Sequence, residues 1–142
     1  MKQTVKITLS VILLVALALT AIACTSAADP KELWDDATYT SDREFGNGAK
    51  TITVKIEVGE NSVTFTLHTD KDTVGAALME HDLIAGDQGQ YGLYLKVANG
   101  ITADYDVDQS YWAFYIDGET ALTGVDGAAA EEGVVYSLVY TK

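Results

Sequence analysis

Strict alternation of apolar and polar residues along two short runs constrains the fold of this chain more than any other feature. The alternation covers 51–58 and resumes over 63–68, after a turn at Gly59-Glu60-Asn61. The apolar members are Ile52, Val54, Ile56, Val58, Val63, Phe65 and Leu67. Because successive side chains of a strand point to opposite faces, a period of two places every apolar side chain on one face. The sequence therefore predicts a β-hairpin with one buried face.

A helical period replaces the alternation directly after the hairpin. Over 73–82 the apolar residues are spaced as on one face of a helix, and Asp72 or Thr73 can cap its first turn. Such a helix would close the open face of the hairpin. We expect it to end before Gly86, and we expect 86–89 to be a loop.

Further extended segments follow the helix. They are 91–98, 101–105, 111–116, 119–123 and 134–141, with turn signals at Asn99-Gly100 and Asp117-Gly118. This order predicts the α+β class, with a single mixed β-sheet and one covering helix, and one folded domain over 49–142. The chain has one cysteine, which excludes an internal disulfide and any site built from several thiolates. The core alone must therefore stabilise this domain.

The first 23 residues have the organisation of a secretory signal peptide. Lys2 and Lys6 accompany the uncharged apolar run 7–23, which is too short to favour spanning a bilayer. Small residues precede Cys24, and this arrangement resembles a bacterial lipobox. The resemblance implies cleavage before Cys24, lipidation of its sulfur, and anchoring on the outer, extracytoplasmic face of a cell membrane. The alternative is an ordinary signal peptide or a retained helix in which Cys24 falls by chance.

The segment 24–48 is polar and is interrupted by Pro30 and two glycines. We expect a lipid-anchored tether there, with a short helical turn over 30–37. Trp34 and Tyr39 within it either fold back on the domain or are disordered.

The charge balance limits the classes of partner. The chain carries 9 basic and 21 acidic residues, and its formal net charge of −12 becomes −14 once the two lysines of 1–23 are removed. A surface this acidic repels phosphate backbones, so no nucleic-acid partner is expected. No basic cluster is present to meet anionic lipid headgroups, so the lipid anchor is the expected contact with the membrane.

The sequence offers few groups suited to catalysis. His68 and His81 are the two histidines, and neither has the spacing of a metal ligand or of a base beside a nucleophile. The motifs of serine hydrolases, phosphate-binding loops and zinc proteases are missing from the sequence. We therefore expect a protein that is not an enzyme, with no catalytic residues and no metal site.

Three aspartates at alternate positions, Asp104, Asp106 and Asp108, would share one face of an extended chain, where a hard cation could sit. A helix-loop-helix calcium loop would require glycine and glutamate at the positions that Gln109 and Tyr115 occupy. The favoured interpretation is a solvated edge that discourages strand-to-strand aggregation.

Aromatic residues are concentrated in one part of the chain. Seven of the thirteen lie between Tyr91 and Tyr115. Two rows alternate over 111–116: Tyr111, Ala113 and Tyr115 in one, and Trp112, Phe114 and Ile116 in the other. Only one row can face a helix-covered core, and the sequence does not decide which. The other row is either a flat platform for a planar ligand or a protein partner, or merely a Tyr-rich second face.

Several segments carry a family resemblance: 73–78, 90–95, 101–105, 111–119 and 123–125. The most specific is the Tyr-Trp-x-Phe stretch at 111–114 with the Gly-Glu and Gly-Val pairs that follow it. They resemble the C-terminal β-domain of the cobalamin carriers transcobalamin and intrinsic factor, a unit that bacterial lipoproteins carry alone as a domain of unknown function. The resemblance covers about 51–141 and implies a β-grasp or ubiquitin-like arrangement with a corrinoid-binding face.

The resemblance also implies which residues lie near the ligand: Tyr91, Gly92, Leu93, Tyr94, Trp112, Leu122, Thr123 and Gly124. Trp112 and Tyr94 would supply stacking or edge contacts, while the backbone at Gly92 and 123–124 would supply hydrogen bonds. The carriers enclose cobalamin between this domain and a large helical domain, for which this sequence has no counterpart.

The resulting hypothesis is a surface-anchored, non-enzymatic lipoprotein that captures cobalamin or a related corrinoid and could hand it to a membrane importer. Its only covalent group would be the lipid. The alternative is an extracellular protein-interaction or adhesion module with no small-molecule ligand.

Overall fold

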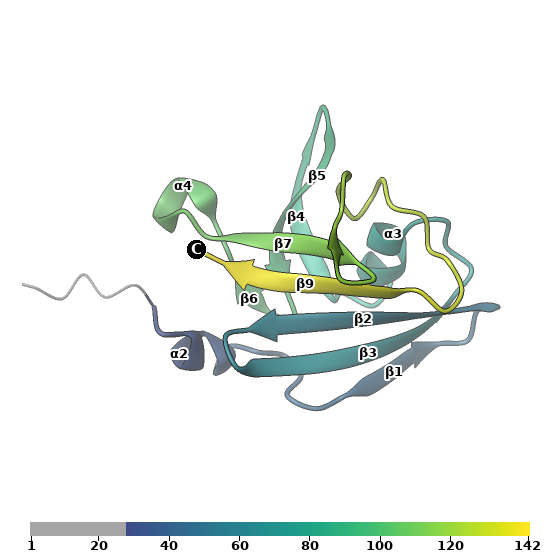
Figure 1. Ribbon diagram of the computed structural model, residues 1–142, viewed down its shortest axis with the longest axis horizontal. Helices are drawn as coiled ribbons and strands as arrows, with labels where there is room; N and C mark the ends of the chain where they lie inside the picture. Colours follow the sequence, from purple (N-terminus) through teal and green to yellow (C-terminus); the bar gives the residue numbers. More distant parts are fainter. Residues whose placement is uncertain (1–27) are drawn as a thin grey trace, which may run out of the picture.

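The computed structural model describes residues 28–142 (Figure 1). The predicted signal peptide and the lipidation of Cys24 lie outside the described residues. Within 28–142, no helix has the length and apolar character needed to cross a membrane.

A six-stranded mixed sheet forms one layer of the molecule, with the strand order β1-β3-β2-β9-β7-β8. Its strands are β1 (Arg43–Gly46), β2 (Lys50–Val58), β3 (Asn61–Thr69), β7 (Tyr111–Ile116), β8 (Glu119–Thr120) and β9 (Val135–Thr141). β2 and β3 form the predicted antiparallel hairpin. β9 lies between the two halves of the sheet, parallel to β2 and antiparallel to β7 (Figure 1).

The hairpin confirms the alternation in the sequence. Every apolar residue of the two rows is at most 1% exposed, while the residues between them are partly exposed or exposed. The helix α3 (Val74–Met79) covers the buried face, and Thr73 is its N-cap, with Oγ1 accepting a hydrogen bond from the N–H of Ala76 at 3.2 Å. α3 is shorter than the predicted 73–82, but its buried residues contact the same core.

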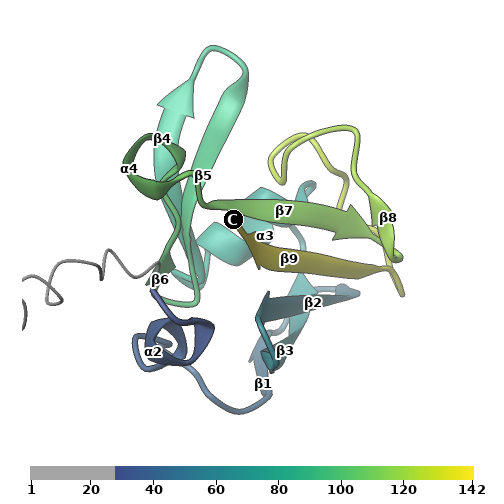
Figure 2. The same ribbon diagram turned by 60° about the vertical axis from the view of Figure 1, so that its left-hand side comes forward.

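A second sheet of three strands makes the predicted single sheet wrong, whereas the α+β class is confirmed. Its strands are β4 (Ile84–Gly89), β5 (Gly92–Ala98) and β6 (Ile101–Thr102), in that order. The predicted loop at 86–89 is therefore part of β4. Only Ile84 of β4 is buried, so this strand has no alternation of apolar residues to reveal it. β4 and β5 project from the body as a long hairpin (Figure 2).

The chain between β6 and β7 also differs from the prediction. The extended segment expected over 101–105 ends at Thr102, and a short helix, α4 (Tyr105–Asp108), follows. Asp104 caps this helix, because its carboxylate accepts a hydrogen bond from the N–H of Asp106 at 3.1 Å. The three aspartates thus surround a helical turn and do not line one face of a strand. The strand predicted over 119–123 likewise ends at Thr120.

The segment before β2 belongs to the folded unit, so the expected boundary at residue 49 lies too late. Helix α2 (Pro30–Trp34) is capped by Asp29, and β1 pairs in parallel with β3. Trp34 and Tyr39 fold back and pack against the core. Asn99, at the β5–β6 turn, accepts a hydrogen bond from the N–H of Tyr39 at 2.9 Å and donates one to its carbonyl at 2.8 Å. The described part of the expected tether is therefore tied to both sheets.

The core fills the space between the six-stranded sheet and a second layer that contains α2, α3 and the base of the β4–β5 hairpin (Figure 2). β7 contributes Trp112 to this core, with Phe114 and Ile116 packed against it. The row of Tyr111, Ala113 and Tyr115 is the one that faces outward.

Candidate functional site

The candidate site is an apolar groove of about 220 Å³ between β5, β7 and the loop 121–125. Its lining residues are Leu93, Tyr94, Leu95, Tyr111, Trp112, Phe114, Gly124 and Val125. In Figure 2 the β4–β5 hairpin and the chain after β8 rise on either side of β7. The groove thus has two projecting walls and a floor of β-sheet.

Trp112 forms the floor of the groove but presents little of its ring. It is 6% exposed, its Nε1 donates a hydrogen bond to the carbonyl of Lys96 at 3.2 Å, and Tyr140 packs edge-on against it at 5.7 Å. A buried indole held in this way can offer an edge to a ligand, whereas stacking on its face would require the core to open. Of the two contacts expected for Trp112, the structure leaves room for the edge contact.

The wall formed by β5 carries aliphatic and aromatic side chains on its two faces. Leu93 and Leu95 pack against the core, and Tyr94, between them, is 43% exposed. Lys96 Nζ lies 5.7 Å from the centre of the Tyr94 ring. Tyr94 therefore lies on the same face of β5 as Lys96, and its exposed ring is accessible at the rim of the groove.

The remaining expected contacts occupy the upper rims. Tyr91, at the hairpin tip, is 95% exposed, and Leu122, in the opposite loop, is fully exposed at 103%. Neither lines the groove itself. Thr123 is exposed beside Gly124, which does line it. The eight expected residues are thus brought to one side of the molecule, with four of them in the groove.

Gly92 does not leave its backbone open to a ligand. Its φ is +106°, and a Cβ at this position would collide with the carboxylate of Asp126. Asp126 Oδ2 accepts a hydrogen bond from the N–H of the next residue, Leu93, at 2.8 Å. The space expected for a ligand at Gly92 is therefore filled by the chain's own carboxylate.

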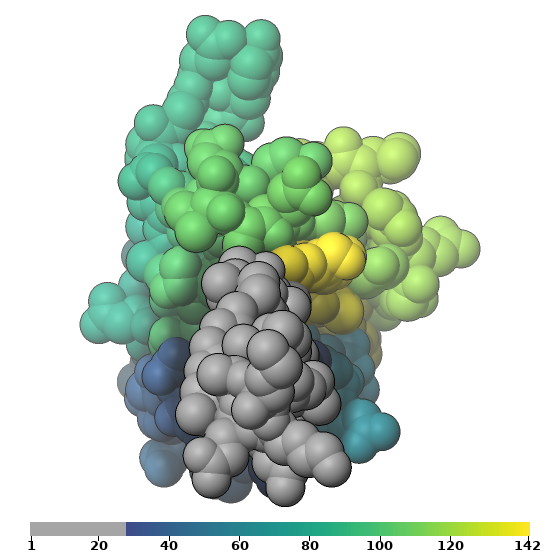
Figure 3. All heavy atoms as spheres, turned by 90° about the vertical axis from the view of Figure 1, so that its left-hand side faces the viewer, coloured from purple at the N-terminus to yellow at the C-terminus, as the bar shows by residue number. Residues whose placement is uncertain are grey.

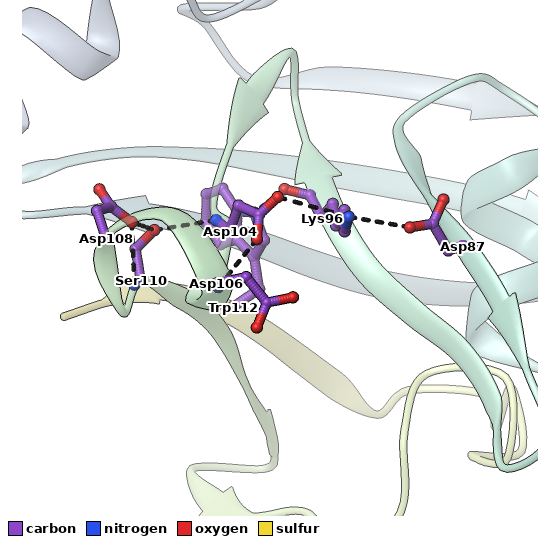
Figure 4. Close-up of polar contacts among 7 residues, drawn as sticks. All are labelled: Asp87, Lys96, Asp104, Asp106, Asp108, Ser110 and Trp112. Atoms are coloured by element: carbon purple, nitrogen blue, oxygen red, sulfur yellow. Dashed lines mark hydrogen bonds and ion pairs between the residues drawn. The ribbon is translucent and has the colours of Figure 1, made fainter.

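Charged residues lie beside the groove and neutralise one another (Figure 4). Lys96 Nζ is 2.9 Å from Asp87 and 3.5 Å from Asp104. Its hydrogen bond to Asp87, reinforced by Asp104, holds the pKa of Lys96 above its ordinary value. Hydrogen bonds from Ser110 and Lys142 hold the pKa of Asp108 below its ordinary value. No charged side chain is among the residues that line the groove.

Both histidines border a polar cleft of about 370 Å³ at the opposite end of the sheet, beside Gly46, Lys71 and Glu80. His68 contacts Thr51 and Glu44 through its two ring nitrogens, at 3.0 and 2.5 Å. His81 instead stacks on Phe45, at 5.3 Å between ring centres. Within residues 28–142, no three His, Cys, Asp or Glu side chains are grouped so that they could hold a metal ion.

Reasoning from the sequence missed part of the groove. Leu95 and Phe114 could have been found, because each lies two positions from an expected residue on the same face of its strand. Tyr111 was expected only as part of a platform. Val125 belongs to the Gly-Val pair of the resemblance but was not among the expected site residues. Asp126, which contacts β5 beside the groove, carried no signal, because its loop is positioned by contacts with α3 and β5.

Comparisons with known proteins give a fold and no family. No protein-family model matches this chain, and no curated protein matches it. A crystal structure from Ruminococcus gnavus ATCC 29149, described as a putative metal binding protein, is similar with a TM-score of 0.62 and 28% identity, over 66% of this chain and 98% of the other. Haptocorrin in complex with Cbi is similar with a TM-score of 0.54 and 16% identity, over 69% of this chain. This chain spans 26% of haptocorrin, and the likeness extends to the fold alone.

Proposed function

We propose that this chain is a ligand-binding domain whose groove takes one edge of a corrinoid such as cobalamin. The observation that carries the proposal is the meeting of Leu93, Tyr94, Trp112 and Gly124, from three separate segments, in one apolar groove. These are half of the positions that the resemblance to the cobalamin carriers selects. The fold shared with haptocorrin, solved with Cbi, supports the same class of ligand.

The size of the groove limits how a corrinoid would be held. At about 220 Å³ it is smaller than the roughly 300–1,000 Å³ of pockets that enclose drug-sized ligands. A corrinoid would therefore be gripped by part of its ring and side chains, with its other face left to solvent or to a second protein. The apolar lining suits a flat amphiphile without anionic groups at the contact.

The cellular setting is part of the same proposal. The signal peptide predicted for 1–23 and the lipobox-like sequence around Cys24 support a lipoprotein on the extracytoplasmic face of a cell membrane. There the domain would capture its ligand without chemical change and pass it to a membrane importer.

The proposal is tested by titrating residues 25–142 with cobalamin and with dicyanocobinamide, using calorimetry alongside tryptophan fluorescence. We expect saturable binding at micromolar or tighter concentration. Tyr94→Ala should weaken it by about 1–3 kcal/mol, as expected for a contact of hot-spot type. Tyr39→Phe is a matched control, because Tyr39 lies on the far side of the core. Wild-type affinity in the Tyr94→Ala protein would show that the groove is not the binding site. Separate titrations with zinc chloride and calcium chloride test whether this chain binds metal ions, the property given for the Ruminococcus gnavus protein.

A protein-interaction module is the second candidate, and the exposed rims favour it. Tyr91 and Leu122 each expose nearly their whole side chain on the two rims of the apolar groove, where a docked protein would cover both together with the groove. A pull-down with the anchored protein, with and without added cobinamide, separates the two candidates. One stoichiometric partner recovered equally in both conditions, and lost with Tyr91→Ser and Leu122→Ser, would favour the module.

A further inference from the structure

The loop between β8 and β9 forms one wall of the groove and is held from two sides. On one side it is anchored to α3, where the N–H of Gly75 donates to the carbonyl of Val125 at 2.7 Å and that of Val74 to Ala128 at 3.0 Å. On the other side its contact is the hydrogen bond from the N–H of Leu93 to Asp126. Asp126 therefore joins the loop wall to the hairpin wall.

The chain is fitted closely around this carboxylate. Gly92 adopts a positive φ and leaves the volume that the carboxylate of Asp126 occupies. A Cβ on Gly124 would lie 3.3 Å from Asp126 Oδ1, tighter than an ordinary contact. Two glycines thus accommodate one side chain, 33 residues away from the amide that it binds.

The opposite wall needs such a tie. Beyond Ile84, the side chains of β4 are exposed, and the pairing with β5 shifts register between Ala85 and Gly86. Trp112 fixes β5 to the floor at the carbonyl of Lys96, three residues further from the hairpin tip than Leu93. The contact of Asp126 with Leu93 lies nearer the tip, so Tyr94 and Leu95 fall between the two attachment points of β5.

We propose that Asp126 is a positioning residue, whose carboxylate ties the loop 121–130 to β5 and sets the width of the groove before any ligand arrives. Its consequence for affinity rests on the proposed function, whereas its effect on the groove does not. A preformed groove lowers the cost of ordering two walls on binding.

The width can be measured directly between the two rims. Spin labels at Tyr91→Cys and Leu122→Cys, in the full chain in detergent with Cys24→Ser, report the distance between the walls, since both sites are exposed. We expect Asp126→Ala to lengthen or broaden this distance distribution. Asp126→Asn should restore it, because the amide oxygen can still accept the hydrogen bond from Leu93. Without the labels, Asp126→Ala should also speed hydrogen exchange of the Leu93 amide and weaken cobinamide binding about twofold to tenfold, the range of one hydrogen bond.

Asp87→Ala is the matched control. Asp87 is also a carboxylate at the hairpin, but it pairs with Lys96 outside the groove (Figure 4), so it should leave the distance unchanged. If circular dichroism shows that Asp126→Ala does not fold, Gly92→Ala serves instead, because its methyl group would displace the carboxylate. An unchanged distance in Asp126→Ala or Gly92→Ala, or an equal change in Asp87→Ala, would overturn the proposal. A widened groove in a protein whose wild type binds no corrinoid would refute the proposed function and leave the role of Asp126 standing.

Discussion

Two hairpins of this domain have the same antiparallel pairing but different roles. In β2–β3 the apolar row of side chains is completely buried in the core. In β4–β5 a single residue of β4 is buried, and the hairpin projects beyond the body (Figure 3, upper left). The first hairpin contributes the apolar burial that stabilises the fold. The second contributes a wall of the groove, and its place depends on individual hydrogen bonds.

This difference predicts that stability and ligand affinity depend on different parts of the chain. Substitutions in β2–β3 should lower the free energy of unfolding without any special effect on the groove. Substitutions along β5 and the loop 121–130 should change affinity at nearly constant stability. The predictions below compare the buried hairpin with the segments around it, and the Asp126 and Tyr94 variants described above test the binding side of this separation.

The largest expected effect is that of Phe65→Ala in β3. Phe65 is fully buried and makes edge contacts with Tyr39 and Phe45 at 5.8 and 5.6 Å. The lost burial and the cavity left behind should lower the free energy of unfolding by about 3–5 kcal/mol, measured by urea denaturation. The control is Thr66→Ala, on the outward face of the same strand, which should change it by less than about 0.5 kcal/mol. Equal losses in the two variants would contradict the assignment of the buried face.

Asn99→Ala should have an intermediate effect and marks the border between the two regions. Asn99 is buried, has a φ of +50°, and makes both side-chain hydrogen bonds to Tyr39. Leaving the partly buried backbone groups of Tyr39 without these partners should cost about 1–3 kcal/mol and make 35–42 sensitive to limited proteolysis. Asn99→Asp is a partial rescue, because it retains an acceptor for the N–H of Tyr39. Wild-type protease resistance in Asn99→Ala would show that other contacts hold this segment.

The same division explains what the sequence could and could not predict. The alternation of β2 and β3, the capped helix after Thr73 and the Asn99-Gly100 and Asp117-Gly118 turns are local signals, and the structure contains all of them. The sequence did not predict β4, because this strand depends on pairing with β5 and its own Gly86 and Gly89 are typical of loops. The sequence did not predict β1 either, because a short parallel strand depends on a partner that lies further along the chain.

The site was predictable to a similar degree. Leu93, Tyr94, Trp112 and Gly124 could be chosen from motifs, but motifs do not show which row of β7 faces the core. That choice follows from where α3 and the second sheet pack, and it turned Trp112 inward. Asp104, Asp106 and Asp108 have the same spacing in a strand as around a helical turn, so spacing alone could not distinguish the two.

The smallest expected effect concerns α4, which leads into the floor of the groove. Because hydrogen bonds hold the pKa of Asp108 below its usual value in the folded protein, their stabilisation is present above the unfolded pKa and is lost as the pH falls through the folded pKa. Ser110→Ala removes the largest cause and should raise the pKa of Asp108, measured by carboxyl NMR titration. Its unfolding free energy should then fall less than that of the wild type in acid. Lys142→Ala should also raise this pKa, because Lys142 donates a hydrogen bond to Asp108 and attracts its charge. An unchanged pKa in both variants would show that these contacts do not hold the carboxylate.

The position of β9 has a consequence for the time at which the fold can form. β9 is the last strand along the chain, yet it lies in the middle of the six-stranded sheet, with β2 on one side and β7 on the other. Until 135–141 is available, the β2–β3 hairpin and the β7–β8 hairpin have no strand to join them. A chain still being synthesised would therefore stay open until its final strand emerged, and would then close in one late, long-range step.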